Sequence, residues 1–363
     1  MIYFIPSILA VFCAYMLNHT KGFFWYVFFS FAILLPSIIY GCRSVSVGTD
    51  ALVYAEPIWD YAMSIQTFDF GPYWGKNIEF GYLLLNYILA MQFTHIQWLF
   101  LFLATVACFV VLKSFINSEF KSEAWLGYAF FLFIFFPESA NAIRQGFASA
   151  FIIGASNAMF QKKWKNFFIL IAIAALFHNV SLLALSFPLI TYIFNTKNSK
   201  IRQYFWGILL ILFVLCGQFI FSQLVFLNDK YAIYVDGTFD PHFSLFSLIN
   251  LPFIFLFMVY YKPLKNLYSF HATEVYMLIV GLIFSQLSWT ASVYLARVAG
   301  PFNLFLLFAP MMILKWIKIK KIKHLKAVVI FANLAYAISY FWLAYYVSGI
   351  DSLFPYRSEF IDF

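Results

Sequence analysis

Arg144 lies where one long apolar run ends near Pro137 and the next run begins, which makes it a chemically informative cation. A helix that starts there presents free backbone N–H groups, and a guanidinium beside them adds a planar, permanently charged fork. Both features bind anions such as phosphate groups, so this position predicts an anion site. The alternative is that Arg144 only extends its charged end to lipid headgroups.

A second polar cluster, His178-Asn179-Val180-Ser181, interrupts an apolar stretch that predicts a short helical hairpin over 167–194. Its arms of about 11 and 14 residues rise at most about 21 Å at 1.5 Å per residue. The polar tip would then stop within the membrane or near its outer interface, buried in protein or lining a wet cavity. Imidazole exchanges a proton near neutral pH, so His178 is a candidate catalytic residue. The alternative is that it only hydrogen-bonds to a neighbouring span.

The composition identifies the chain that carries these residues as an all-α polytopic membrane protein. Of its 363 residues, 64% are apolar and 10% are charged, which leaves too few polar side chains to cover a water-soluble globule. Unbroken apolar blocks favour helices over the alternating pattern of a membrane barrel. About twelve spans are expected. They are 2–17, 23–41, 96–116, 124–136, 142–160, 204–227, 246–262, 273–291, 298–315 and 327–347, together with the two arms of the hairpin 167–194.

The positive charges predict how these spans are oriented. All but six of the 23 Lys and Arg residues lie in alternate polar breaks, which are assigned to the cytoplasmic side. This assignment places most acidic residues and both termini outside. The six outer cations are Arg43, Lys76, Arg144, Lys230, Arg297 and Arg357. Cations near membrane depth are costly and tend to be paired or functional. The net charge of +8 therefore reflects orientation, and nucleic-acid binding is not predicted.

The segment 42–94 is predicted to form one long outer loop, although part of it is apolar enough to resemble a span. Counting that part as a span would invert every later lysine cluster or place an acid-rich segment in the cytoplasm. Two juxtamembrane helices are expected instead, at 51–65 and 79–93, along the outer interface. With a second outer loop at 228–245, the whole chain, 1–363, is predicted to be a single integral membrane domain.

Several chemistries have no motif in this sequence. There is no G-x-x-x-x-G-K-[ST], H-E-x-x-H or C-x-x-C pattern, which argues against an ATP-driven pump, a zinc site and redox chemistry. The four cysteines have no close spacing that predicts disulfides or metal binding. No Asp-x-Asp pair occurs either, so the sequence predicts no metal and no cofactor.

Five short motifs together resemble the EpsG-like branch of the bacterial Wzy-type polysaccharide polymerases, and the resemblance runs nearly end to end. They are Arg43 to Asp50 followed by Tyr54, Glu79 to Tyr82, Asn141 to Gln145, Phe177 to Ser181, and Pro355 to Ser358. Members of this family are similar to membrane glycosyltransferases of the GT-C class. They join repeat units of O-antigen, capsule or exopolysaccharide, carried on undecaprenyl diphosphate, at the outer face of the bacterial cytoplasmic (inner) membrane.

The resemblance implies a role for each candidate residue. A departing diphosphate spreads charge over several oxygens, which fixed guanidinium groups stabilise without a metal. Arg144 and Arg297 are expected in that role, with Arg43 assisting. The acceptor hydroxyl needs a base, for which the candidates are Asp50, Glu79, Glu138 and His178. Tyr234 and Asp236, in the loop 228–245, are expected to cover the acceptor sugar.

Three other functions remain open from the sequence. A ligase that moves finished polymer to a lipid core uses nearly the same site. A transporter or flippase of the lipid-linked unit also needs buried cations, but no inverted repeat is detected. A membrane O-acyltransferase would use a buried His as base. For a polymerase, the expected partners are the lipid-linked oligosaccharide and membrane lipid, with a flippase and a chain-length regulator as further candidates.

Overall fold

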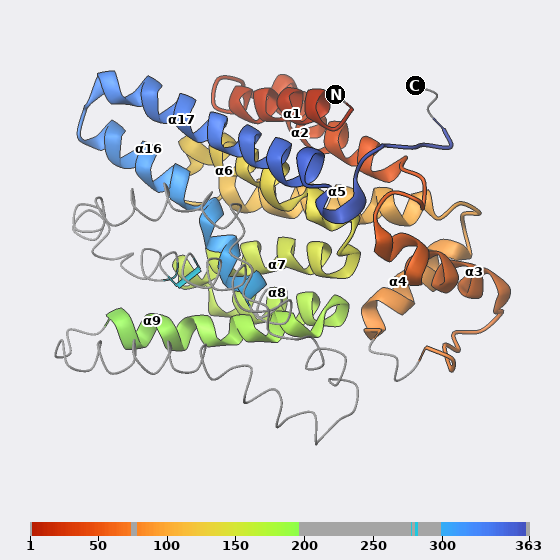
Figure 1. Ribbon diagram of the computed structural model, residues 1–363. Helices are drawn as coiled ribbons and strands as arrows, with labels where there is room; N and C mark the ends of the chain where they lie inside the picture. Colours follow the sequence, from red (N-terminus) through yellow and green to blue (C-terminus); the bar gives the residue numbers. More distant parts are fainter. Residues whose placement is uncertain (1, 74–77, 196–276, 278–279, 282–298, 361–363) are drawn as a thin grey trace. The chain divides into compact units, whose positions relative to one another are not determined.

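The computed structural model describes residues 2–73, 78–195, 277, 280–281 and 299–360. Within these residues the chain is helical, with one isolated β-bridge between Arg43 and Ser358 (Figure 1). The chain divides into two compact units, Met1–Leu182 with Leu307–Phe363, and Leu183–Leu306. The single membrane domain expected over 1–363 stays a prediction, because most of the second unit lies outside the described residues.

The first unit carries most of the described helices. In the labels of Figure 1 they are α1 (Phe4–Met16), α2 (Gly22–Gly41), α3 (Glu56–Ser64), α4 (Phe80–Ala90), α5 (Gln97–Ile116), α6 (Ala124–Phe130), α7 (Ile143–Phe160), α8 (Trp164–Phe177), α16 (Ala309–Ile319) and α17 (Lys323–Phe341). Short π-helical segments, Ala51–Ala55, Phe131–Phe135 and Trp342–Val347, adjoin α3, α6 and α17. Short 3-10 turns lie at Lys121–Glu123, Pro137–Ala140 and Ile350–Ser352.

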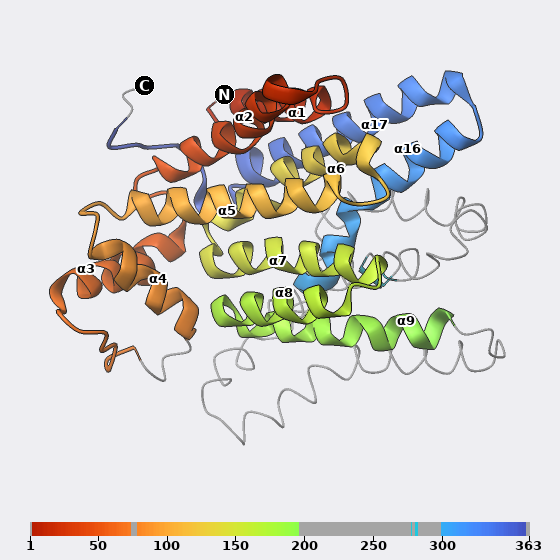
Figure 2. The ribbon, with the colours of Figure 1, turned by 180° about the vertical axis from the view of Figure 1, so that it is seen from behind.

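The helices of this unit pack in a row in which α1 contacts α2, α2 contacts α5, α5 contacts α7 and α7 contacts α8. Figure 2 shows this order from behind. Helices α6 and α17 pack against each other beside the row, and α16 contacts both. The interior of the row is apolar, with Phe100, Phe115 and Phe167 almost fully buried. Many outward-facing large side chains are apolar too, as expected where lipid is the solvent.

Four helical stretches in the described part of the chain are long and apolar enough to cross a membrane: Gly22–Gly41, Gln97–Ile116, Ala299–Ile319 and Lys323–Val347. They agree with the runs expected at 23–41, 96–116, 298–315 and 327–347. The expected spans 204–227 and 246–262 lie outside the described residues, as does most of 273–291. The structure therefore supports a multi-pass helical membrane protein, whereas the count of about twelve spans and the GT-C class stay predictions.

Helices appear where the outer loop 42–94 was expected to carry them. A π-helical turn and α3 cover 51–64, and α4 follows Glu79. With 11 residues, α4 is about 17 Å long, which is too short to cross a hydrocarbon core of about 30 Å. Its length agrees with a juxtamembrane helix. Helices α3 and α4 pack against each other.

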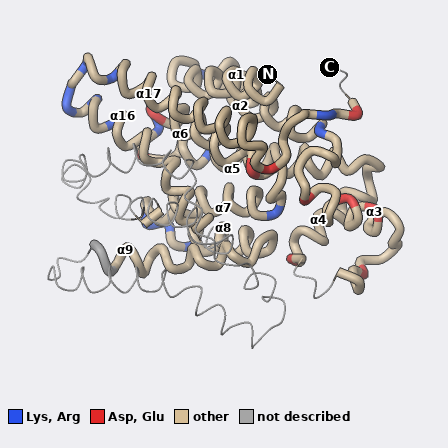
Figure 3. Tube along the Cα trace, viewed as in Figure 1, with Lys and Arg blue, Asp and Glu red and all other residues tan. Residues whose placement is uncertain are grey.

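Opposite charges gather at different ends of the first unit. Figure 3 shows Lys and Arg around the turn between α16 and α17, and acidic residues around α3 and α4. At the lysine-rich end, Lys315 Nζ binds Glu119 Oε2 at 2.9 Å and Lys318 Nζ binds Glu123 Oε1 at 2.5 Å. Glu119 and Glu123 thus pair with lysines that the charge pattern assigns to the cytoplasmic side.

In the second unit the structure describes α9 (Phe187–Asn195) and a 3-10 turn that begins at Leu304. The ring of Phe187 packs edge-on against Phe302 and Phe305, with centroid distances of 5.3 and 5.0 Å. Apolar contact therefore holds α9 against the segment around residue 304.

Candidate functional site

The carboxylate of Glu79, directly before α4, is the centre of a polar cluster. Its Oε2 binds Arg144 Nη1, in the first turn of α7. Its Oε1 accepts the backbone N–H of Asn179 at 3.0 Å and lies 3.4 Å from His178 Nδ1. Only 8% of Glu79 is exposed. One buried carboxylate therefore contacts both Arg144, which the sequence selected for anion binding, and His178, which it selected for proton exchange.

Local backbone geometry explains how these groups meet. Helix α8 ends at Phe177 because His178 is extended, with φ −157° and ψ 113°, and the Asn179 N–H is then available to Glu79. A Cβ at Gly81 would come within 2.7 Å of the Leu176 carbonyl oxygen, so glycine permits α4 to approach the end of α8 closely. Arg144 arrives from α7, which packs along α8.

The environment keeps Glu79 ionised. Burial raises its pKa, but hydrogen bonding to His178, the charge of Arg144 and the Asn179 N–H together outweigh burial, so the pKa lies below its ordinary value. Glu79 in this arrangement is a charged hydrogen-bond acceptor at neutral pH. It lies on the Nδ1 side of His178, whereas Nε2 is a buried nitrogen without a hydrogen-bond partner among the described residues.

Tyr54 extends the cluster toward a second carboxylate. The guanidinium carbon of Arg144 lies 4.7 Å from the centre of the Tyr54 ring, within cation–π range. The Tyr54 hydroxyl donates to Asp50 Oδ2 at 2.9 Å. Asp50 is therefore linked to Arg144 through a single aromatic side chain.

The side chain of Asn141 fixes the backbone around Asp50. Its Oδ1 accepts the Thr49 N–H at 2.9 Å, the Thr49 hydroxyl at 2.6 Å and the Asp50 N–H at 3.2 Å. Its Nδ2 donates to Asp351 Oδ1 at 2.9 Å. Asn141 thus joins three stretches of chain that are distant in sequence.

Close backbone packing supports the same junction, which is the meeting of residues 49–50 and 351 at the Asn141 side chain. Gly48 has φ +87°, and a Cβ there would lie 2.3 Å from the Ala140 carbonyl oxygen, so only glycine fits this approach without rearrangement. The Gly48 N–H donates to the Ser352 carbonyl at 3.2 Å, and the Ser44 N–H donates to the Arg357 carbonyl at 2.8 Å. The late segment 350–358 therefore lies against residues 43–48.

Glu138 and Asp351 form an acidic region beside this junction. Burial and the nearby Asp351 raise the pKa of Glu138 to about 8. Burial raises the pKa of Asp351 to about 6, against the lowering effect of its hydrogen bond from Asn141. Glu138 holds a proton at neutral pH, which makes it a poor base there and a hydrogen-bond donor instead.

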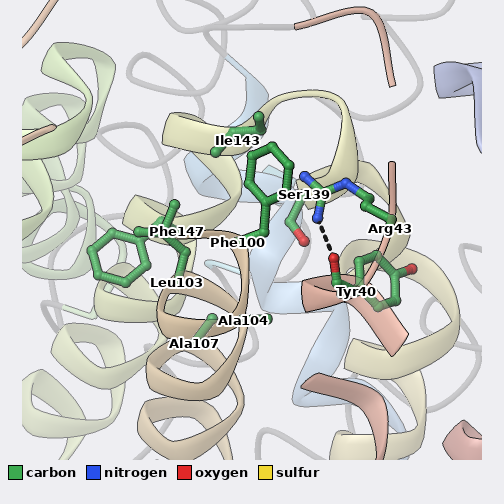
Figure 4. A pocket seen from close by; sticks show the side chains of 9 residues that line it. All are labelled: Tyr40, Arg43, Phe100, Leu103, Ala104, Ala107, Ser139, Ile143 and Phe147. Carbon is green, nitrogen blue, oxygen red and sulfur yellow. Dashed lines mark hydrogen bonds between the residues drawn. The ribbon is translucent and has the colours of Figure 1, made fainter. Parts of the chain in front are cut away.

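Arg43 lies at one side of a small pocket between α2, α5 and α7 (Figure 4). Its Nη1 donates to the Tyr40 carbonyl at 2.6 Å, its Nη2 donates to the Ala140 carbonyl at 3.3 Å, and the Phe100 ring lies 4.0 Å below the guanidinium. The residue is only 3% exposed. Its role as a diphosphate ligand stays a prediction, while these contacts favour a role in holding the 137–141 turn.

The structure thus brings together Glu79, Arg144 and His178, with Asp50 linked through Tyr54. Glu138 lies in the 137–140 turn next to the Asn141 junction, and Arg43, just after the end of α2, supports that turn. Arg297, Tyr234 and Asp236 lie outside the described residues. No cluster of three His, Cys, Asp or Glu side chains suited to a metal ion occurs among the residues described.

Sequence reasoning did not select Asn141, Tyr54 or Asp351 as site residues. Asn141 and Tyr54 stand within motifs used for the family resemblance, and that position was their only signal. Asp351 had none beyond its expected location in an outer segment, because its contact with Asn141 spans 210 sequence positions.

Comparison with known protein families gives a match over most of the chain. The model of the EpsG family matches residues 26–358, a range that includes every described member of the polar cluster. No curated protein and no solved structure matches the chain.

Proposed function

The chain belongs to the EpsG family, and on that basis we propose that it polymerises polysaccharide repeat units carried on undecaprenyl diphosphate. The growing glycan is the donor, and a sugar hydroxyl of a newly arrived lipid-linked unit is the acceptor. The reaction takes place at the outer face of the bacterial cytoplasmic membrane. The family match supports a polysaccharide polymerase-type role, and the donor, acceptor and side of the membrane are the further content of this proposal.

The proposed reaction exchanges one bond for another. The bond between the anomeric carbon of the donor glycan and the diphosphate oxygen breaks, and the diphosphate leaves with the electron pair. A bond forms between that carbon and the acceptor oxygen, whose proton passes to a protein base. Fixed positive charge stabilises the leaving group, and the base makes the hydroxyl a better nucleophile.

The observation that carries this proposal is that Glu79 contacts both Arg144 and His178. Arg144 supplies the fork for a diphosphate, at the N-terminus of α7 where backbone N–H groups add to the attraction. His178 supplies the proton-accepting nitrogen, held by Glu79 on its other side. Leaving-group stabilisation and proton removal are thus served by one connected group of residues.

Glu79 is also the counter-charge of Arg144 before substrate arrives. A diphosphate carries more negative charge than a carboxylate and offers several acceptor oxygens, so it competes for the guanidinium. Once displaced from Arg144, Glu79 keeps the Asn179 N–H and His178 as partners. We therefore expect substrate binding to strengthen the hold of Glu79 on an imidazolium during proton transfer.

Purified protein tests the proposal directly. Incubation with synthetic undecaprenyl-diphosphate-linked repeat units should give a ladder of polymer lengths. Transfer of a preformed polymer to a lipid core without a ladder would indicate a ligase instead. In cells that lack the protein, single lipid-linked units should accumulate on the outer face. Units trapped on the inner face would indicate a flippase, and full-length polymer lacking acyl groups would indicate an acyltransferase.

The proposed partners follow from the reaction. The protein takes its acceptor from whichever system moves the repeat unit across the membrane, so a flippase must act before it. A chain-length regulator is a further candidate partner.

A further inference from the structure

The side chain of Asn141 uses both its acceptor and its donor. Three donors converge on Oδ1, and Nδ2 donates to a carboxylate. An Asp at this position would accept the same three hydrogen bonds but would lack a donor for Asp351, and a Leu would supply neither. The contacts therefore require a side-chain amide.

These bonds act on Asp50 from its backbone, while Tyr54 acts on its carboxylate. The Asp50 N–H is held by Asn141, and Asp50 Oδ2 accepts the Tyr54 hydroxyl. The ring of Tyr54 in turn contacts the guanidinium of Arg144. Asn141 thus begins a continuous set of contacts that passes through Asp50 and Tyr54 and reaches the guanidinium.

The surrounding backbone makes Asn141 a rigid support. The turn that precedes it is held by Arg43 through the Ala140 carbonyl, and Gly48 packs directly against the same carbonyl. Neither contact involves the Asn141 side chain. Removing the amide should therefore release Asp50 while the turn itself persists.

We propose that Asn141 is a positioning residue that fixes the Asp50 carboxylate toward the acceptor sugar. The carboxylate lies on the hydroxyl side of Tyr54, whereas Arg144 lies over the Tyr54 ring and binds the diphosphate. This inference rests on the proposed polymerase function. It separates the positioning of the acceptor sugar, which depends on Asn141 through Asp50, from the binding of the diphosphate by Arg144, which does not. The acceptor side is the Asn141 and Asp50 part of the cluster.

Two measurements on the full-length purified protein test this separation. For Asn141→Ala, the kcat of polymerisation should fall about 10- to 100-fold, as expected when a group near the reacting atoms is misplaced by about 1 Å. The Kd for undecaprenyl diphosphate should stay within about twofold of the unmutated value. Asn157→Ala is the matched control, since Asn157 is a buried amide on α7 that donates to the Ser114 carbonyl at 2.8 Å, away from the site. It should polymerise normally.

A reciprocal exchange tests the role of the amide itself. Asn141→Asp should be impaired because it sets a carboxylate against Asp351. Adding Asp351→Asn restores a donor opposite that carboxylate, and turnover should recover at least fivefold over the single variant. Loss of diphosphate binding in Asn141→Ala in step with kcat, or absence of recovery in the double variant, would overturn the inference.

Thr49→Val covers the case in which Asn141→Ala does not fold. It removes the exposed Thr49 hydroxyl that donates to Asn141 Oδ1, and it leaves both backbone donors to that oxygen in place. Reduced kcat with an unchanged Tm supports the inference, and unchanged kcat contradicts it. If the unmutated protein makes no ladder, the proposed function fails, whereas a ladder that is unaffected by Asn141→Ala contradicts only the positioning role.

Discussion

Glu79 binds the guanidinium of Arg144 from a position 65 residues earlier in the chain. The side chains are 6% and 17% exposed, so the pair is shielded from most solvent screening. Removing one partner of such a pair leaves a buried charge uncompensated, which typically costs about 3–5 kcal/mol. Variants that keep the charge are therefore needed to separate activity from stability.

Arg144→Lys is the first such variant. It keeps a positive charge for Glu79 but loses the planar fork, so polymer yield should fall at least about 10-fold if the guanidinium grips diphosphate at two oxygens. The yield is measured from the ladder made by protein of verified Tm. Arg357→Lys, at an exposed arginine, is the matched control, and Lys76→Ala and Lys230→Ala should also matter little. Equal tolerance at all four positions would mean that Arg144 does not grip diphosphate through its planar fork and serves only as the counter-charge of Glu79.

His178→Ala tests proton transfer. The variant should insert and melt like the unmutated protein yet make little polymer, because the acceptor hydroxyl loses its base. His178→Gln should recover part of the activity only if hydrogen bonding to Glu79 is the whole requirement. Polymer yield and Tm are measured together. A depleted or destabilised His178→Ala protein would instead identify the imidazole as a structural tie between α4 and α8.

The orientation of the chain can be tested by labelling single cysteines with an impermeant thiol reagent in a background without native cysteines. Asp60→Cys, Asp236→Cys and Ser352→Cys should react from outside, because acid-rich segments are assigned there. Lys163→Cys, Ser199→Cys and Lys321→Cys should be protected in intact cells. Labelling of position 60 only after permeabilisation would show that α4 is not a juxtamembrane helix of an outer loop.

Glu138 should make stability depend on pH. Its pKa is about 8 in the folded protein against an ordinary value of 4.5, so the folded state binds the proton more tightly. The resulting stability is complete below about pH 4.5 and is lost as the pH rises toward about 8. The Tm should therefore fall between about pH 5 and pH 8, and Glu138→Gln should make that slope shallower. Asp60→Asn, at an exposed carboxylate, should leave the slope unchanged.

Gly81→Ala tests the approach of α4 to α8. A methyl group there would lie 2.7 Å from the Leu176 carbonyl oxygen, so the helix must shift and carry Glu79 away from His178. Overpacking of this kind typically costs about 1–3 kcal/mol, and both Tm and polymer yield should fall. In Gly71→Ala the nearest atom is 3.4 Å away, and this control should behave normally. Full activity of Gly81→Ala would mean that the contact is not needed.

The sequence predicted helices well where a continuous apolar run alone determines them. The apolar run 96–116 became α5 at 97–116, and the short apolar stretch after Glu79 became α4. Arg144 and His178 were selected by residue type and by their place at the ends of apolar runs. Glu79 was a candidate base, but its contact with both residues was not predictable, since it reaches Asn179 across 100 positions through an approach that depends on the packing of Gly81.

Asn141 also has a consequence for how the protein is made. Its partner Asp351 is translated 210 residues later, and residues 350–358 close over segments that left the ribosome long before. Every helix from α1 to α8 can therefore insert while the amide still lacks its carboxylate partner. The proposed acceptor side can therefore be complete only after residues 350–358 have been translated and have packed against residues 43–48.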